Sequence, residues 1–197
     1  MRGARARTII TAITVVAAAA GAHAQSAPQS VDLTVMGSVE RICVLASPQV
    51  NVGGSTNIGQ VAGSTVVIAD LSDADTMTTK AADFTAEFSG MCNFRHQITV
   101  SSDRGGLWRE PAGAPAAGFA NGVPYRATVD WGGSEATLLA GATGESQVQQ
   151  QMTIDLPALG SVALHFHIDQ SATNAGSGVP LVAGTYDDTI RVTLGPL

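Results

Sequence analysis

The chain has 197 residues, of which 13% are charged, and its formal net charge at pH 7 is −6. Such a chain has little to attract nucleic acid or anionic lipid, so we expect neither as a partner. Sparse charge combined with 22 glycines favours β structure with many turns.

Residues 1–24 have the features of a secretory signal peptide. Arg2, Arg5 and Arg7 are followed by an apolar stretch from residue 8 to 21 and by an A-x-A cleavage site at 22–24. Cleavage would leave 173 residues with 7 basic and 16 acidic side chains, enough for one domain. An uncleaved N-terminal anchor is the alternative, but the apolar stretch is short for a membrane span. We expect a protein secreted through the periplasm, with no membrane span after cleavage.

The segment that follows the cleavage site alternates with a period of two. Val31, Leu33 and Val35 share one face of an extended chain, and Asp32 and Thr34 lie on the other. Such a row has two interpretations. It is an edge strand of its own domain, or it is a strand that adds to another molecule.

The chain has two cysteines, Cys43 and Cys92. An exported protein meets an oxidising compartment, so we expect one disulfide between them. Closing a loop of this length stabilises a fold by about 4 kcal/mol in the chain-entropy model. A thiol metal site is disfavoured because the CxxC spacing of zinc sites is absent.

Most of the remaining chain also alternates, as half-buried strands do. The alternating stretches are 84–92, 98–100, 123–131, 152–156, 162–168 and 186–194. Turn-rich connectors separate them, notably at 53–57, 103–106, 111–124 and 171–180. We therefore expect an all-β fold, an antiparallel β-sandwich or barrel, with one helical turn between residues 70 and 82.

The sequence offers little for catalysis. No G-x-S-x-G elbow is present, and an oxidised Cys pair supplies no nucleophile. Asp187 and Asp188 would point to opposite faces of one strand, which is poor geometry for paired acid–base work. We expect no enzyme and no cofactor.

Two other sets of residues are candidate binding sites. His165 and His167 would share one face of a strand, so they are the candidate metal ligands, although the alternation also predicts that they face solvent. Four aromatic residues are candidates for a carbohydrate site, with ordinary core packing as the alternative: Trp108, Trp131, Tyr125 and Phe119.

The two ends of the mature chain carry the most informative patterns. Residues 31–43 read V-D-L-T-V-M-G-S-V-E-R-I-C, and residues 181–194 read L-V-A-G-T-Y-D-D-T-I-R-V-T-L. Together with a second Cys after the strand at 84–92, they resemble the spore coat U domain family, which includes the archaic chaperone–usher pilus subunits. The resemblance spans the mature chain and is weak from residue 105 to 161.

The resemblance implies an immunoglobulin-like, pilin-type sandwich that lacks one strand. A periplasmic chaperone, and later the extension of a neighbouring subunit, fills the gap by donor-strand exchange during secretion through an outer-membrane usher. The resemblance also assigns residues 25–36 as the donor extension and residues 37–197 as the domain. The donor side chains would be Val31, Leu33 and Val35. The acceptor groove would be lined by the first strand after Gly37 and by the last strand, with Tyr186, Ile190, Val192 and Leu194.

The expected function is thus a structural subunit of a surface pilus or coat. The alternatives are a coat protein that folds alone without an usher, and a periplasmic metal- or carbohydrate-binding module. One departure from the family is the ending Leu194-Gly-Pro-Leu197, because Pro196 cannot donate a ladder hydrogen bond.

Overall fold

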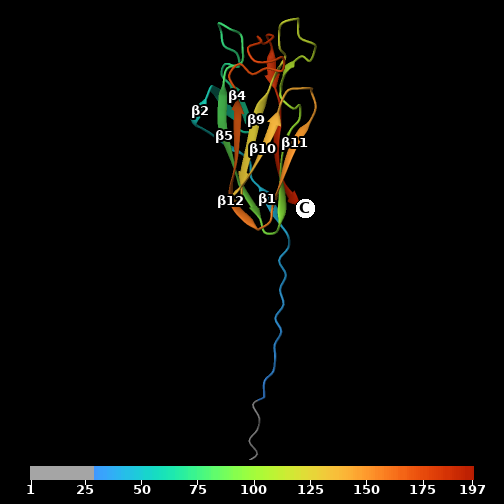
Figure 1. Ribbon diagram of the computed structural model, residues 1–197. Coiled ribbons are helices and arrows are strands. Elements are labelled where there is room, and N and C mark those ends of the chain that lie inside the picture. The colour runs from blue at the N-terminus through green and yellow to red at the C-terminus, as the bar shows by residue number, and fades with distance from the viewer. Residues whose placement is uncertain (1–28) are drawn as a thin grey trace, which may run out of the picture. The chain divides into compact units, whose positions relative to one another are not determined.

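The structure is a computed structural model that describes residues 29–197 (Figure 1). Within this range the chain forms strands and turns only, so the all-β prediction is confirmed. No helix in the described range is long and apolar enough to cross a membrane. The expected helical turn between residues 70 and 82 is present as one isolated turn, in which the N–H of Met77 donates to the carbonyl of Asp73 at 2.8 Å, and the β-bridge between Ser72 and Thr79 flanks it. The predicted signal peptide lies outside the described residues.

The larger of two main sheets is antiparallel and is built from strands far apart in sequence. Its order is β1-β5-β12-β9-β10, and β2 also pairs with β5. The strands are β1 (Cys43–Leu45), β2 (Gln49–Thr56), β5 (Ala82–Cys92), β9 (Tyr125–Trp131), β10 (Ser134–Ala140) and β12 (Ala158–Ile168). The short β1 and the bulged β2 lie one after the other along the same edge of β5.

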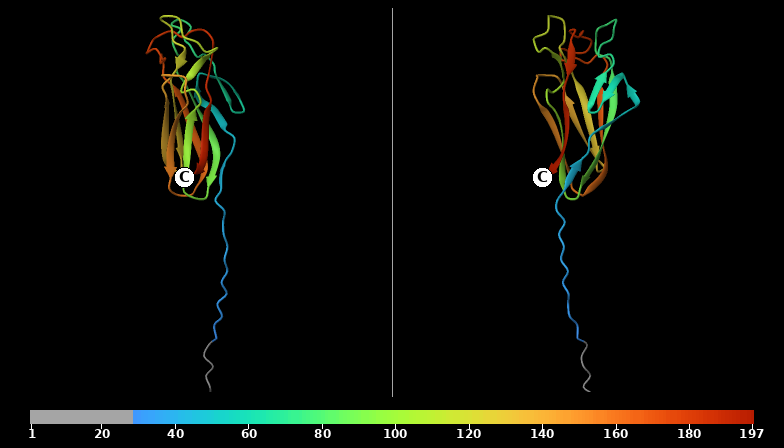
Figure 2. Two further views of the ribbon diagram at one scale, coloured as in Figure 1. Left: turned by 90° about the vertical axis from the view of Figure 1, so that its right-hand side faces the viewer. Right: turned by 180° about the vertical axis from the view of Figure 1, so that it is seen from behind.

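The second main sheet has the order β11-β6-β14, with β11 (Val148–Ile154), β6 (His96–Ser102) and β14 (Ile190–Pro196). The two sheets lie face to face as the layers of a β-sandwich (Figure 2). Two smaller sheets complete the fold. One joins β7 (Leu107–Glu110), β8 (Gly122–Val123) and β13 (Thr185–Asp187), and the other is a hairpin of β3 (Ile58–Ala62) and β4 (Thr65–Ile68).

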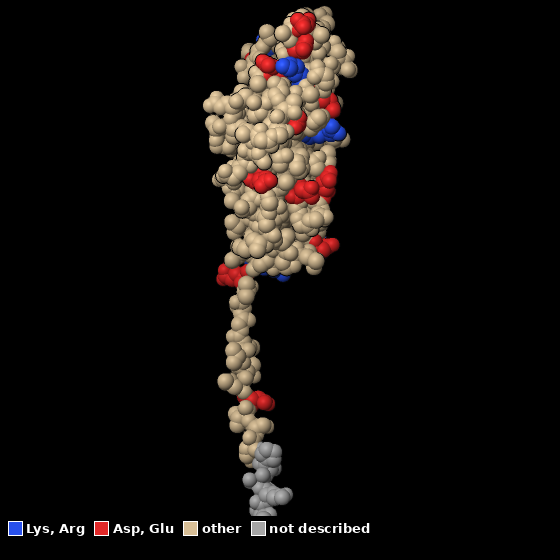
Figure 3. Space-filling view, turned by 90° about the vertical axis from the view of Figure 1, so that its left-hand side faces the viewer, with Lys and Arg blue, Asp and Glu red and all other residues tan. Residues whose placement is uncertain are grey.

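The core forms because alternate residues of each long strand point between the two sheets. In β12 the inward residues Val162, Leu164, Phe166 and Ile168 are buried, and β6 contributes Ile98 and Val100 from the other side. On the face that Figure 3 shows, charged side chains are few, as the composition predicts.

One buried polar pair lies within this apolar core. The indole Nε1 of Trp131 donates to Nε2 of His96 at 2.7 Å. The other ring nitrogen of His96, Nδ1, lies 2.8 Å from the carbonyl oxygen of Phe94. A carbonyl only accepts, so the hydrogen sits on Nδ1 and the Nε2 lone pair receives the indole proton. Both polar groups of the ring are thus satisfied, which allows complete burial.

The predicted disulfide is confirmed. Cys43 and Cys92 are bonded, and they lie directly opposite each other in the register of β1 and β5. A strand of three residues has few ladder bonds of its own. The disulfide therefore fixes β1, and with it the start of the domain, to the edge of β5.

Candidate functional site

An open apolar groove runs along the free side of β14. Its volume is about 310 Å³. Ile190 and Val192 line one wall, and Val50 of β2 with Val66 and Ile68 of β4 line the other. The groove lies between the two main sheets, at the margin where they are not joined.

Aromatic side chains form much of the floor of the groove. The rings of Phe84 and Phe166 stack with their centroids 4.9 Å apart, and Tyr125 lies against Phe166 at the same separation. Ala86, Phe88 and Leu164 add further apolar surface from the larger sheet. A floor of this kind offers hydrophobic burial to an extended segment with apolar residues on one face.

The edge of β14 that faces away from β6 has no ladder partner among the described residues. The N–H of Asp103 donates to the carbonyl of Thr189 at 2.9 Å, so these two opposite residues form a hydrogen-bonded pair. Hydrogen-bonded and non-hydrogen-bonded pairs alternate along an antiparallel ladder, so the next pair, Ser102 with Ile190, is non-hydrogen-bonded. Alternation then makes Val192 and Leu194 members of such pairs too. These three residues direct their backbone N–H and C=O groups away from β6.

The same alternation explains Pro196. It lies opposite His96 in the register, again in a non-hydrogen-bonded position. Its missing N–H would therefore have pointed to the free edge, and the ladder with β6 loses no bond. Proline is tolerated in a sheet at such edge positions.

Asp188 holds the start of β14 in place. Its carboxylate accepts hydrogen bonds from the Ser102 and Tyr125 hydroxyls, the latter at 2.7 Å. It also accepts from the backbone N–H groups of Arg104, Gly106 and Thr189, at 3.0, 3.2 and 2.7 Å. This aspartate thus joins β6, the loop after it, β9 and β14. Burial, more than any other effect, raises the pKa of the Tyr125 hydroxyl well above its ordinary value.

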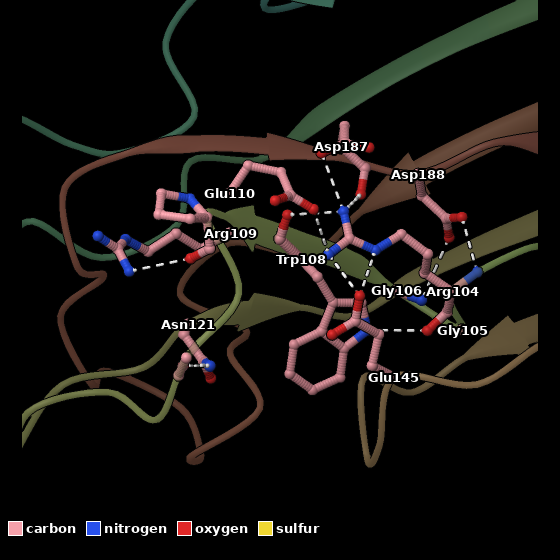
Figure 4. Close-up of polar contacts among 12 residues, drawn as sticks. Arg104, Gly105, Gly106, Trp108, Arg109, Glu110, Asn121, Glu145, Asp187 and Asp188 are labelled. Carbon is pink, nitrogen blue, oxygen red and sulfur yellow. Dashed lines mark hydrogen bonds and ion pairs between the residues drawn. The ribbon is translucent and has the colours of Figure 1, made fainter.

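The neighbouring Asp187 belongs to a second cluster, centred on Arg104 (Figure 4). The Arg104 side chain is only 15% exposed, and its Nη1 lies 2.9 Å from a carboxylate oxygen of Asp187. Its Nη2 lies 2.8 Å from Glu110 and 2.6 Å from Glu145, but neither approach is aligned with an N–H bond, so these are ion pairs and not hydrogen bonds. Its Nε donates to Glu145 at 2.8 Å.

Asp187 and Asp188 therefore serve two networks that meet at Arg104, whose side chain pairs with Asp187 and whose backbone N–H donates to Asp188, and together they fix loops at one end of the sandwich. The role of the second aspartate was missed in the sequence, where the pair was considered only for acid–base chemistry. The sequence feature that could have indicated this role is the position of Asp188, two residues before Ile190, the first apolar residue of β14.

Tyr186 and Gly184 have structural contacts outside the groove. The Tyr186 hydroxyl donates to the carbonyl of Val182 at 2.8 Å. Gly184 has a φ of +156°, and a Cβ there would lie 2.9 Å from Nε of Arg109. Burial raises the pKa of the Tyr186 hydroxyl, and Arg109 opposes that shift.

The groove differs from the predicted one in three respects. The predicted final strand, 186–194, is two strands, because Asp188 and Thr189 interrupt it. Tyr186 and Leu194 are half-buried against the core but do not line the groove. The first strand after Gly37, β1, does not line it either; the wall consists of β2 and β4, where no strand was predicted. The run Thr65-Val-Val-Ile68 after the turn glycine Gly63 was the signal for that hairpin.

The predicted donor side chains lie in a segment without secondary structure. Across residues 29–38 the chain has no strand, and Val31, Leu33 and Val35 are 93%, 87% and 85% exposed. The alternate apolar side chains of this segment are therefore left uncovered within the part of the chain that the structure describes.

His165 and His167 line a second, more polar pocket on the outer face of the larger sheet. His165 Nδ1 lies 3.0 Å from the Thr85 hydroxyl, and His167 Nε2 lies 3.1 Å from a carboxylate oxygen of Asp169. Within residues 29–197 no group of three or more His, Cys, Asp or Glu side chains is placed to hold a metal ion.

The aromatic residues considered for a carbohydrate site are mostly internal. Trp108, Trp131 and Tyr125 are buried, and only Phe119 of the four is exposed. A sugar-stacking platform needs exposed ring faces, so these four side chains do not form one.

Comparison of the chain with protein-family models, with curated proteins and with solved structures finds no match. The geometry of the groove and the exposed row at residues 31–35 therefore provide the basis for a functional proposal.

Proposed function

We propose that the protein is a structural subunit of a surface pilus or coat, and that it polymerises by donor-strand exchange. The sandwich would be of the incomplete, immunoglobulin-like pilin type, and the extension of one subunit would enter the groove of the next. The observation that carries the proposal is the apolar groove beside the unpaired edge of β14, in a chain whose segment at 29–38 exposes an alternating apolar row.

The dimensions of the two partners agree. Residues i and i+4 of a strand lie about 13 Å apart, so Val31 to Val35 could lie alongside Ile190 to Leu194 on the free edge of β14, of which Ile190 and Val192 line the groove. An added strand would place its apolar face on the aromatic floor and its backbone against the outward N–H and C=O groups of β14. It would also remove an open sheet edge, which otherwise promotes uncontrolled association.

The energetics favour a tight junction. Burying each large apolar side chain is worth roughly 1.5–3 kcal/mol, and each net backbone hydrogen bond about 1 kcal/mol. Three side chains and several hydrogen bonds together exceed the cost of ordering a short extended segment. We propose accordingly that the partners are other subunits, a periplasmic chaperone that protects the groove, and an outer-membrane usher, and that no chemistry on a substrate is involved.

The test is a matched pair of substitutions in the extension. Leu33→Asp places a charge on the apolar face, whereas Thr34→Asp places the same charge on the opposite face. With the chaperone co-expressed, unboiled samples on a denaturing gel should show a heat-sensitive ladder for the wild type and Thr34→Asp, and no ladder for Leu33→Asp. A ladder of normal length from Leu33→Asp would show that residues 31–35 are not the donor row.

A further inference from the structure

His165 and His167 lie two residues apart on β12 and line the same pocket on the outer face of the larger sheet. We infer that the two imidazoles form a site for one divalent transition-metal ion, Zn²⁺, Cu²⁺ or Ni²⁺, with water in the remaining coordination positions. Two protein ligands are fewer than a closed structural zinc site uses, so the ion would be exchangeable. The site is separate from the apolar groove and would bind its ion with or without donor-strand exchange.

A break in the ladder between β2 and β5 opens the pocket. The register shifts between Asn51 and Thr56, so residues 52–55 form a bulge on β2. Gly53 and Gly54 lie in this bulge and line the pocket, and Gly54 has a φ of +90°, which favours glycine. The pocket has a volume of about 310 Å³, several times the ~30 Å³ that one water occupies in the liquid. It therefore has room for an ion and its waters.

The backbone of β12 holds the two histidines in fixed places. β12 is a central strand, paired with β5 along its whole length and with β9 from Ala163 to His167. Residues i and i+2 of a strand project from the same face, with their Cα atoms roughly 7 Å apart. Two imidazoles at this spacing can reach one ion, and imidazole is a preferred ligand of zinc, copper and nickel.

Each ring has one nitrogen engaged by a neighbour and the other free to bind a metal. Nε2 of His167 lies 3.1 Å from Oδ1 of Asp169. A carboxylate only accepts, so the hydrogen sits on Nε2 and Nδ1 keeps its lone pair. Nδ1 of His165 lies 3.0 Å from the Thr85 hydroxyl, which can accept, so Nε2 can keep its lone pair. A metal-binding histidine commonly donates its other N–H in this way, which orients the ring.

The charges around the two rings favour a cation. Asp83 lines the pocket and lies opposite His167 in the register with β5. Arg126 lies opposite His167 on the β9 side and pairs with Asp169 at 3.4 Å. Two carboxylates thus surround the rings against one guanidinium. Because the ligands are imidazoles, Mg²⁺ and Ca²⁺, which prefer oxygen, are not expected to bind.

The small number of histidines makes the site testable. Of the four, His23 belongs to the predicted signal peptide, and His96 is buried with both ring nitrogens engaged. Calorimetric titration of the untagged mature chain should show one equivalent of Zn²⁺, tighter binding of Cu²⁺ and no binding of Mg²⁺. His165→Gln and His167→Gln should each weaken Zn²⁺ binding by about tenfold or more. Ser161→Gln, at an exposed position of the same strand, should leave it unchanged.

Thermal unfolding provides a second readout and shows that the variants fold. Zn²⁺ should raise the Tm of the wild type and leave unchanged the Tm of a chain carrying both His165→Gln and His167→Gln. Equal Zn²⁺ affinity in the wild type and the double variant would place the ion elsewhere and overturn the assignment. The absence of Zn²⁺ binding to the wild type up to about 1 mM would overturn it as well.

Discussion

At the scale of single residues, Gly90 permits close packing in the core. A Cβ at this position would lie 2.9 Å from Cγ2 of Val162 and 3.0 Å from the Trp131 ring, both of which are buried. We predict that Gly90→Ala destabilises the domain by about 1–3 kcal/mol, measured by urea unfolding. Gly113→Ala, where a Cβ would have nothing within 4 Å, is the control. Equal stability of the two variants would contradict this packing.

The two tyrosines give a prediction about pH. The chain has only Tyr125 and Tyr186, and burial raises the pKa of both hydroxyls above the ordinary value of 10.0. A raised pKa in the folded state means that the neutral hydroxyls stabilise the fold fully below about pH 10, and that this contribution is lost as pH rises above that value. Ultraviolet titration should show tyrosinate appearing at higher pH in the folded protein than in urea. Coincident titration curves would contradict the burial of both groups.

Arg191 pairs with Asp103 at 3.2 Å on the outer face of β14, and under the proposed function Asp32 of an added strand would lie beside that pair, which gives a third prediction. Asp32 and Arg191 would lie on the same outward face of the joined strands. In a synthetic peptide of residues 29–40, which supplies the strand to an acceptor carrying Leu33→Asp, Asp32→Arg should weaken binding by an amount typical of exposed pairs, up to about 1 kcal/mol. Arg191→Asp in the acceptor should restore it. Failure of the double charge reversal to recover affinity would show that these two residues are not neighbours at the junction.

At the scale of elements, the free edge of β14 can be tested with proline. Val192 directs its N–H to the free edge, whereas Thr193 belongs to a hydrogen-bonded pair with Thr99. Val192→Pro should therefore destabilise the isolated domain less than Thr193→Pro does, as measured by thermal unfolding. It should also prevent peptide binding. If the two prolines are equally destabilising, the assigned alternation of β14 is wrong.

Strand prediction from the sequence succeeded where one face is buried in the core. The alternation at 84–92 and 162–168 predicted the inward faces of β5 and β12, because a period of two reports burial on one side. The hairpin β3–β4 was missed because both its strands are short and largely exposed. The alternation from 186 to 194 predicted one continuous strand, but the hydrogen bonds of the Asp188 carboxylate interrupt it at Asp188 and Thr189. Such side-chain contacts leave no periodic pattern in the sequence, so the break could not be predicted.

At the scale of the whole molecule, the sequence predicted the disulfide. Ile190 and Val192, two of the residues assigned to an acceptor groove, line the groove, and its role as an acceptor stays a prediction. The opposite wall comes from residues 50–68, which approach β14 only through the tertiary fold. Sequence spacing carries no information on such contacts between distant segments. The alternating apolar row at residues 31–35 could be recognised from the sequence because it depends only on neighbouring residues.

The central claim is that the extension of one molecule occupies the groove of another, and cysteine cross-linking between two differently marked molecules tests it most directly. One carries Leu33→Cys and the other Val192→Cys, mixed under mild oxidation, with Thr34→Cys in place of Leu33→Cys as the control. The account predicts mixed disulfide-linked dimers from the first combination and far fewer from the control. The absence of any cross-link in the first combination would contradict the account. So would a chain carrying both substitutions that forms only an intramolecular cross-link, at any dilution.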